Sequence, residues 1–292
     1  MRVPDAMTQQ ALFELMARAR ARRDDALLQM ASGRRVVSPS DDPRAARELL
    51  ALADESAAVT SQLRTAGVAR PWLELAEDVV STIGERLTRA SVLAVQGAST
   101  ALTSAQRASL ADEIAGIRAE LIAMSERQLD GRFVFSGTRT DTAPFDAAGA
   151  YQGNADAVEI RLDGQAVALN LPGNAVFGEV GVGGPLDTLA RLEAALRADD
   201  IAGIQAAAGA LDADLAANST TLAQVGTRLI EIDQATTRLE DRKLRLAARA
   251  DELGAADLAE AITAAEQGDA HYQATLAATS RLFGPTLFDY LG

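Results

Sequence analysis

The sequence predicts a mainly α-helical protein: a long antiparallel helical rod or coiled coil built from both chain ends, with a small β-rich insertion in the middle. Three observations predict this fold. Apolar residues make up 48% of the 292 residues but aromatic residues only 4%, and alanine and leucine supply most of the apolar content, which suits long helices packed side by side. Apolar residues recur at alternating steps of four and three over 211–253, the spacing of a coiled-coil seam. Within 133–182 this spacing gives way to the period of β-strands.

The first segment, residues 5–31, carries a loose apolar face and predicts a helix. Its positive side chains are clustered. A solvated helix face explains such a cluster best, and contact with an acidic partner segment is the alternative. The cluster consists of Arg18, Arg20, Arg22 and Arg23.

A stiff polar stretch then predicts a joint between two helices. Gly33 favours a helix end because glycine tolerates positive φ. Two prolines keep the residues before them extended, and the aspartates between them can cap the next helix, whose first turn accommodates a proline. We expect residues 1–42 to contribute this joint and the first helix to a terminal domain. The joint residues are Pro39, Asp41, Asp42 and Pro43.

Two long helical stretches predict the rod. Residues 43–132 form its N-terminal half, in which Pro71 predicts a bend or break and Ser104 the cap of a third helix. Residues 185–253 form its C-terminal half. Asn218 lies in the heptad there, so we expect a buried seam asparagine rather than a glycosylated one, although Asn-Ser-Thr is an acceptor sequence.

Residues 133–184 predict the β-rich insertion, placed at the end of the rod far from the termini. Apolar residues alternate on both sides of Asp163-Gly164, which is typical of a two-residue hairpin turn. The following stretch, "GEVGVGGPLDTL", could suggest a phosphate loop. It lacks the Lys-Ser/Thr ending and Pro185 removes an amide, so it is interpreted as a linker.

The last segment, residues 254–292, predicts the partner helix of the terminal domain. Gly254 breaks the rod helix, and Asp257 can start another. The nearly palindromic layout predicts that the chain folds back on itself, with this break level with the one after Gly33. Heptad spacing from Leu258 onward predicts a seam, and apolar residues of both terminal helices form the candidate partner interface. These are Leu12, Met16, Leu258, Ile262, Tyr272, Leu276 and Phe283.

Composition and motifs argue against several classes of function. The net charge of −13 disfavours nucleic acid, and the lack of cysteine excludes disulfides, thiolate metal sites and cysteine nucleophiles. No apolar run is long enough to span a membrane, and we expect no cleaved signal peptide. Asp41 and Asp42 alone make a poor cation site, and His271 has no recognisable catalytic partner. We therefore expect no catalytic residue, no metal, no cofactor and no enzyme.

Four stretches resemble the flagellin superfamily, and within it the FlgL-type hook-associated proteins. They are "SGRRVVSPSDDPRA", "WLELAEDVVSTIGERLTRASVLAVQGAS", "GRFVFSGTRTDTAPF" and the C-terminal "ADLAEAITAAEQGDAHYQATLAATSRLFGPTLFDYL". Three features depart from the family pattern: Ser136 stands where glycine is usual, "EQGDAHYQ" replaces a Gln- and Thr-rich form, and Gly284-Pro285 is unusual.

The resemblance implies a structural subunit of the bacterial flagellum that joins the hook to the filament. Its partners would be the first hook-associated protein, flagellin, further copies of itself in a ring and an export chaperone. It would be extracellular, exported by the flagellar type III apparatus.

Other functions stay open. Flagellin itself belongs to the same class. A coiled-coil signalling protein would use the long heptads, although the β-rich insertion and the unlike terminal helices argue against it. A secreted adhesin would use residues 133–182 as a binding head.

Overall fold

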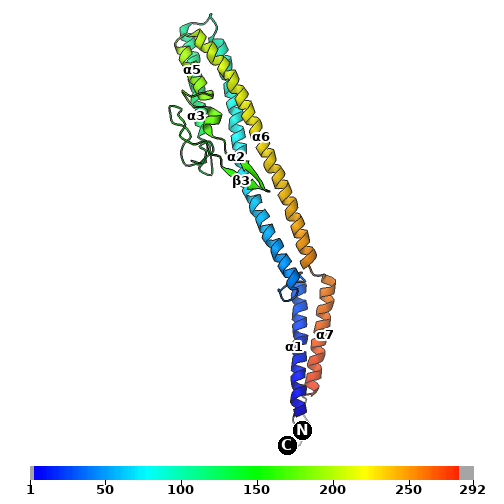
Figure 1. Ribbon diagram of the computed structural model, residues 1–292. Helices are drawn as coiled ribbons and strands as arrows, with labels where there is room; N and C mark the ends of the chain where they lie inside the picture. Colours follow the sequence, from blue (N-terminus) through cyan, green and yellow to red (C-terminus); the bar gives the residue numbers. More distant parts are fainter. Residues whose placement is uncertain (1–2, 283–292) are drawn as a thin grey trace. The chain divides into compact units, whose positions relative to one another are not determined.

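The computed structural model describes residues 3–282, and within them long helices and a few short antiparallel strands (Figure 1). The predicted mainly α-helical fold with a small β part is therefore confirmed. The helices are α1 (Val3–Ser32), α2 (Pro43–Gly97), α3 (Ser104–Ser125), α4 (Gly173–Phe177), α5 (Pro185–Arg197), α6 (Ile201–Gly254) and α7 (Leu258–Leu282). The strands are β1 (Gln128–Leu129), β2 (Arg132–Phe133), β3 (Glu159–Leu162) and β4 (Gln165–Ala168).

The chain forms two compact units. One, called here the terminal unit, consists of Met1–Ala58 and Arg242–Gly292, so both chain ends build it. The other, the central unit, is Val59–Asp241. The boundary predicted after residue 42 coincides with the start of α2, and the one predicted after residue 253 lies at the end of α6. That these positions separate domains remains a prediction.

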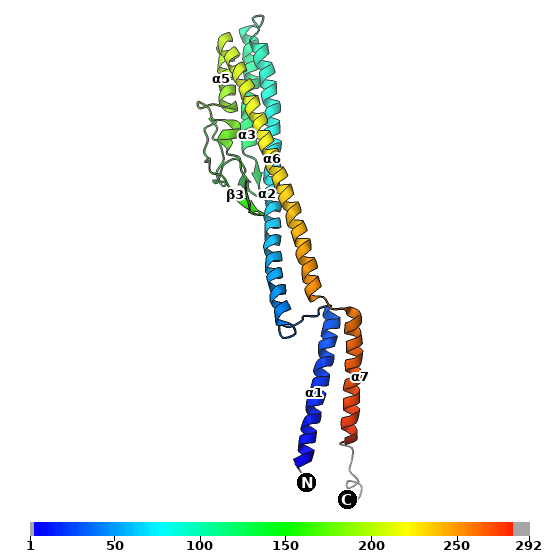
Figure 2. The same ribbon diagram turned by 45° about the vertical axis from the view of Figure 1, so that its right-hand side comes forward.

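The terminal unit contains two antiparallel pairs of helices. Helices α1 and α7 lie side by side in both views (Figures 1 and 2). The first turns of α2 pair with the last turns of α6, because Glu55 forms an ion pair with Arg242 (2.6 Å) and Glu48 one with Arg249 (3.2 Å). The partner numbers rise on one helix as they fall on the other, so this pair is antiparallel.

In the central unit the same two helices are also antiparallel. Arg70 of α2 pairs with Asp233 of α6 at 2.7 Å, and about three turns further along α2 the Val80 carbonyl accepts a hydrogen bond from Asn218 Nδ2 (3.1 Å). Helices α3 and α5 pack against each other beside them. The side chain of Asn218 is 8% exposed, so the expected seam asparagine is confirmed.

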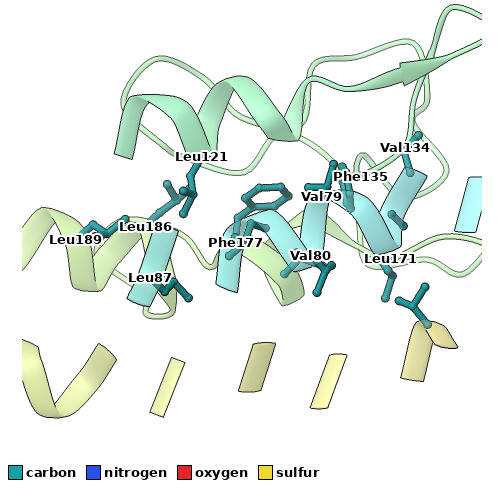
Figure 3. Packing of buried hydrophobic residues seen from close by; sticks show 14 of the residues in the cluster. Val79, Val80, Leu87, Leu121, Val134, Phe135, Leu171, Phe177, Leu186 and Leu189 are labelled. Atoms are coloured by element: carbon teal, nitrogen blue, oxygen red, sulfur yellow. The ribbon is translucent and has the colours of Figure 1, made fainter. Parts of the chain in front are cut away.

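The core of the central unit is formed by α2, α3, α4, α5, α6 and the insertion, and Figure 3 shows part of it. Each fully buried leucine or isoleucine there contributes about 1.5–3 kcal/mol to folding. Four aromatic rings add edge-to-face or tilted contacts, with centroids 5.2 Å apart for Phe135 and Phe177 and 5.2 Å apart for Phe145 and Tyr151. The aromatic residues of the predicted insertion therefore belong to the same buried cluster as the helices.

The clearest predicted β element, the hairpin around Asp163-Gly164, is confirmed. Strands β3 and β4 pair antiparallel, and both turn residues have positive φ, 50° at Asp163 and 81° at Gly164, as a tight type I′ turn requires. The Asp163 N–H donates to Gln62 Oε1 of α2 (2.9 Å), and Arg238 of α6 donates to Asp163 Oδ2 (2.7 Å). The hairpin thus lies against both long helices.

The expectation that the β-rich insertion lies at the far end of the rod is wrong. Within the central unit, the connections between α2 and α3 and between α5 and α6 lie where α2 ends and α6 begins, whereas the hairpin contacts Gln62 and Arg238, near the limits of the unit at Val59 and Asp241. Arg107, which is 3% exposed, joins these connections by donating to the carbonyls of Gly97 (2.8 Å) and Ser99 (2.7 Å) and pairing with Asp199.

The predicted break at Pro71 and the predicted cap at Ser104 are also wrong. Helix α2 runs through Pro71 without a break, because Ala69, Trp72 and Leu73 are all buried and their burial offsets the roughly 3 kcal/mol that a proline costs inside a helix. Helix α3 is capped by Thr103 rather than Ser104. Thr103 and Gln106 form a reciprocal capping box, which satisfies two backbone N–H groups at once.

Among residues 3–282, no helix combines the length and the apolar character that a membrane span needs.

Candidate joint and assembly surfaces

The joint links the end of α1 to the end of α6 through backbone hydrogen bonds. Helix α1 ends at Ser32, and Gly33 follows with φ 65°. The Arg35 N–H donates to the Gly254 carbonyl (2.8 Å), and the Ala256 N–H donates to the Gly33 carbonyl (2.9 Å). These two bonds flank an antiparallel bridge, so the breaks after Gly33 and Gly254 are level, as predicted.

Arg35 reinforces this link, and the sequence did not single it out. Its Nη2 donates to the Leu253 carbonyl (2.9 Å), and its Nη1 lies 3.3 Å from Asp42 Oδ2. One side chain therefore contacts both the end of α6 and the start of α2. No local pattern distinguishes this arginine from Arg34 beside it, because its partners lie far away in sequence.

Asp41 holds the extended part of the joint in shape. Its Oδ2 accepts hydrogen bonds from the Val37 N–H (3.0 Å) and the Ser38 N–H (2.7 Å), and its Oδ1 accepts one from the Ser38 hydroxyl (3.0 Å). These bonds, those from Ser38 above all, stabilise the carboxylate and lower the pKa of Asp41. Asp41 therefore organises the turn that contains Pro39.

Asp42 caps α2, as predicted. Its Oδ1 accepts hydrogen bonds from the N–H groups of Arg44 (3.1 Å) and Ala45 (3.0 Å), and Pro43 is the first residue of the helix. The bond from Ala45 and the proximity of Arg35 lower the pKa of Asp42. Both aspartates are thus engaged in hydrogen bonds within the joint.

The face of α7 that packs on α1 shares Ala265 and Tyr272 with the predicted heptad. The residues of α7 buried in the terminal unit are small: Ala261 (4% exposed), Ala265 (7%) and Gly268. A Cβ at Gly268 would lie 3.1 Å from the Cα of Arg23, so α1 and α7 approach closely there. Small residues allow this close packing, and the partner interface through the large apolar residues of α7 stays a prediction.

Arg23 is the main polar contact between α1 and α7. Its guanidinium lies 4.8 Å from the ring centroid of Tyr272, a cation–π contact, and 3.9 Å from Asp269. It also pairs with Asp24 at 2.8 Å, and that hydrogen bond, followed by the neighbouring carboxylates, raises the pKa of Arg23. Tyr272, a predicted interface residue, is thus half-buried inside the terminal unit.

Three other predicted interface residues lie on the outside of α7. Leu258 is 55% exposed, Ile262 45% and Leu276 40%. Met16 is half-buried on α1. Leu12 lies in α1, but its side chain is outside the described part of the structure, and Phe283 is outside the described residues altogether.

The described residues contain no group of three or more His, Asp or Glu side chains arranged to hold a metal ion. A hollow of about 420 Å³ lies beside the joint, lined by residues such as Leu49, Leu52 and Leu246. Another, of about 290 Å³, lies under the glycine-rich loop before α5. His271 is an exposed residue of α7. None of these places assembles a nucleophile, a base and an oxyanion site.

Comparison with known proteins identifies the family. The family described as the bacterial flagellin N-terminal helical region matches residues 4–140. Flagellar hook-associated protein 3 of Escherichia coli K12 is 30% identical over 241 residues, which cover 74% of this chain and 76% of that protein. The chain belongs to the flagellar hook-associated protein 3 (FlgL) family.

A second relative has a similar sequence, and two solved structures share the fold. Flagellar hook-associated protein 3 of Salmonella typhimurium LT2 is 34% identical over 137 residues, 46% of this chain and 43% of that protein. FlgL of Bacillus cereus shares the fold at a TM-score of 0.59 and 22% identity, over 69% of this chain and 99% of that one. The flagellar junction protein FlgL of Legionella pneumophila shares the fold at a TM-score of 0.58 and 15% identity, over 71% of this chain and 99% of that one.

Membership in the FlgL family makes the chain a structural protein of the bacterial flagellum, at the junction between hook and filament. Such a protein interacts with hook and filament components. The predicted family and the predicted junction function are therefore confirmed, and flagellin is the less supported alternative.

Proposed function

We propose that this protein binds the first hook-associated protein on the hook side and flagellin on the filament side, as one of several copies in a ring. The observation that carries the proposal is the exposed apolar surface of the terminal unit. Both chain ends meet in it, and its close α1–α7 contact uses small residues, so the large apolar side chains Leu258, Ile262 and Leu276 remain exposed. Exposed apolar residues on a paired helix are suited to binding neighbouring subunits.

In this proposal α1 and α7 form the assembly domain, and the joint connects them to α2 and α6 within the terminal unit. Residues 1–42 and 254–292 contribute to neighbour contacts, and Pro39, Asp41, Asp42 and Pro43 set the geometry of the joint. Its bonds are numerous and local: Asp41 holds the extended turn, Asp42 caps α2, and the backbone bridge ties Gly33 to Ala256. A rigid joint would present the assembly domain in one fixed orientation to both neighbours.

We further propose export through the flagellar type III apparatus with the help of a chaperone. A chain without cysteine forms no disulfide that would have to be broken before passage through a narrow channel. The support for this is the family resemblance.

Deleting the gene tests the junction function against flagellin. A strain that lacks a junction protein should keep hooks, lose filaments and release intact flagellin into the medium. A strain that lacks its flagellin should lose filaments and release none. Full-length filaments in the deletion strain would rule out both.

A further inference from the structure

The chain contains two Asp-Gly pairs with closely matched neighbours in sequence. Residues 129–132 are Leu-Asp-Gly-Arg, and residues 162–165 are Leu-Asp-Gly-Gln. Each pair forms the two-residue turn of a hairpin, with φ 50° at both aspartates, Asp130 and Asp163, and 75° and 81° at the glycines that follow them. The two turns share local sequence and backbone, so a difference in their chemistry must arise from the structure around them.

An Asp-Gly pair is prone to a spontaneous rearrangement of its backbone. The glycine nitrogen attacks Cγ of the aspartate carboxyl group, a water molecule leaves, and a five-membered succinimide ring forms. Glycine favours this step because it has no side chain to hinder the approach. Water then opens the ring at either carbonyl carbon and yields aspartate or isoaspartate, in which the chain runs through Cβ and Cγ. The sum of both steps adds and removes no atom, and water is the only co-reactant.

The turn at Asp163 is held by contacts with both long helices. Asp163 Oδ2 accepts a hydrogen bond from Arg238 (2.7 Å), and the Asp163 N–H donates to Gln62 Oε1 (2.9 Å). Ring closure needs a rotation about the Cα–C bond of the aspartate, which a tight turn restricts, so the turn has to open first. Opening this turn breaks both contacts, and the ion pair also keeps the carboxyl group away from the Gly164 nitrogen.

The turn at Asp130 lacks such contacts. Asp130 and Gly131 are both exposed, and within residues 3–282 no group forms a hydrogen bond or an ion pair with the Asp130 carboxylate. Strands β1 and β2 pair over two residues each, whereas β3 and β4 pair over four. A short ladder with an exposed turn opens at a lower cost in free energy. Asp130 therefore meets the conditions for ring closure more often than Asp163.

We propose that Asp130-Gly131 is a site of spontaneous isoaspartate formation in the folded protein, and that Arg238 and Gln62 protect Asp163-Gly164 from the same reaction. Isoaspartate lengthens the backbone of the turn by one methylene group, so β1 and β2 lose their two-residue connection. This hairpin leads from α3 to Val134 and Phe135 of the core, so the modification changes how the chain enters the insertion. The inference concerns the central unit alone and does not depend on the proposed function.

Peptide mapping after prolonged incubation measures both sites in one sample. The purified full-length protein is kept at neutral pH, either native or unfolded in guanidinium chloride, and is then digested with trypsin. Cleavage after arginine places the two sites on separate peptides, residues 128–132 and 162–191. Isoaspartate has the mass of aspartate but a different retention time, and electron-transfer fragmentation distinguishes the two residues.

In the native protein we expect isoaspartate to accumulate roughly tenfold faster at Asp130 than at Asp163, because one ion pair and one hydrogen bond shift an opening equilibrium by about that factor. In guanidinium chloride the two rates should become similar, because the neighbouring residues are alike. Equal rates in the native protein, a faster reaction at Asp163, or no reaction at Asp130 would overturn the proposal. So would the same tenfold difference in the unfolded chain, since local sequence would then explain it.

The variant Arg238→Gln tests the protecting contact. It should raise the rate at Asp163 several-fold and leave the rate at Asp130 unchanged. The matched control is Arg242→Gln, which removes an equally exposed arginine one turn further along α6 that pairs with Glu55 instead. An unchanged rate at Asp163 in Arg238→Gln, or an equal rise in the control, would show that Arg238 does not protect the turn. Fluorescence of Trp72 verifies that both variants are folded.

Discussion

Replacing Arg107 by methionine should strongly destabilise the central unit. The arginine is 3% exposed and donates to the carbonyls of Gly97 and Ser99. Methionine keeps much of the packing volume but cannot donate a hydrogen bond. The Gly97 carbonyl, on a buried residue, would then lose its donor at a cost of about 1–3 kcal/mol, whereas Ser99 is exposed and its carbonyl can bind water.

The ion pair with Asp199 adds less, because that carboxylate side chain is 49% exposed. We therefore expect Arg107→Met to lower the free energy of unfolding by about 2–4 kcal/mol, and Asp199→Asn by less than about 1 kcal/mol. Asparagine is a suitable control because it tolerates the positive φ of 58° at this position.

Urea unfolding followed by tryptophan fluorescence measures both variants. The chain has one tryptophan, Trp72, which is 8% exposed in the core of the central unit and so reports on that unit. With a denaturant slope of about 2 kcal/mol per molar, the midpoint of Arg107→Met should fall by about 1–2 M. A fall of less than about 0.5 M, or an equal fall for Asp199→Asn, would refute the reasoning that the carbonyl contacts dominate.

Three further changes test other parts of the molecule. Replacing Pro39 and Pro43 by alanine should keep or raise helix content and retain export but reduce swimming; normal swimming with higher helix content would mean that the joint is a passive linker. Removing residues 256–292 should leave the fluorescence of Trp72 unchanged and abolish filament attachment; full-length filaments would contradict this. Burial raises the pKa of Asp214, so its ionised form disfavours folding, and Asp214→Asn should be the more stable protein at pH 7. The difference in urea midpoint should shrink as the pH falls toward about 3, below the ordinary aspartate pKa of about 3.9, where the carboxyl is protonated in both the folded and the unfolded state; a constant difference would contradict this.

The sequence predicts those elements whose signals are local. The four-three spacing of α6, the caps and breaks of the joint, and the Asp163-Gly164 turn are all carried by nearby residues, and the structure has them. Helix α4 escaped prediction because it has only five residues, too few to establish a helical period.

Contacts between distant residues are what the sequence does not reveal. Hydrophobic spacing singles out the large residues of α7, whereas the close approach of α1 selects Ala261, Ala265 and Gly268. In the sequence, Arg35 and Arg107 cannot be told from ordinary surface arginines, because their partners at positions 253 and 199 are far away along the chain. Pro71 shows the reverse case, in which tertiary packing overrides a local helix-breaking signal.

Immunogold labelling of isolated flagella tests the central claim most directly. Antibodies raised against this protein are applied to purified hook–filament particles, with particles from the deletion strain as the control. A junction protein predicts a narrow band of gold at the boundary between hook and filament and none elsewhere. Gold distributed along the filament would show a filament subunit instead, and the account of the chain as a junction protein would be wrong.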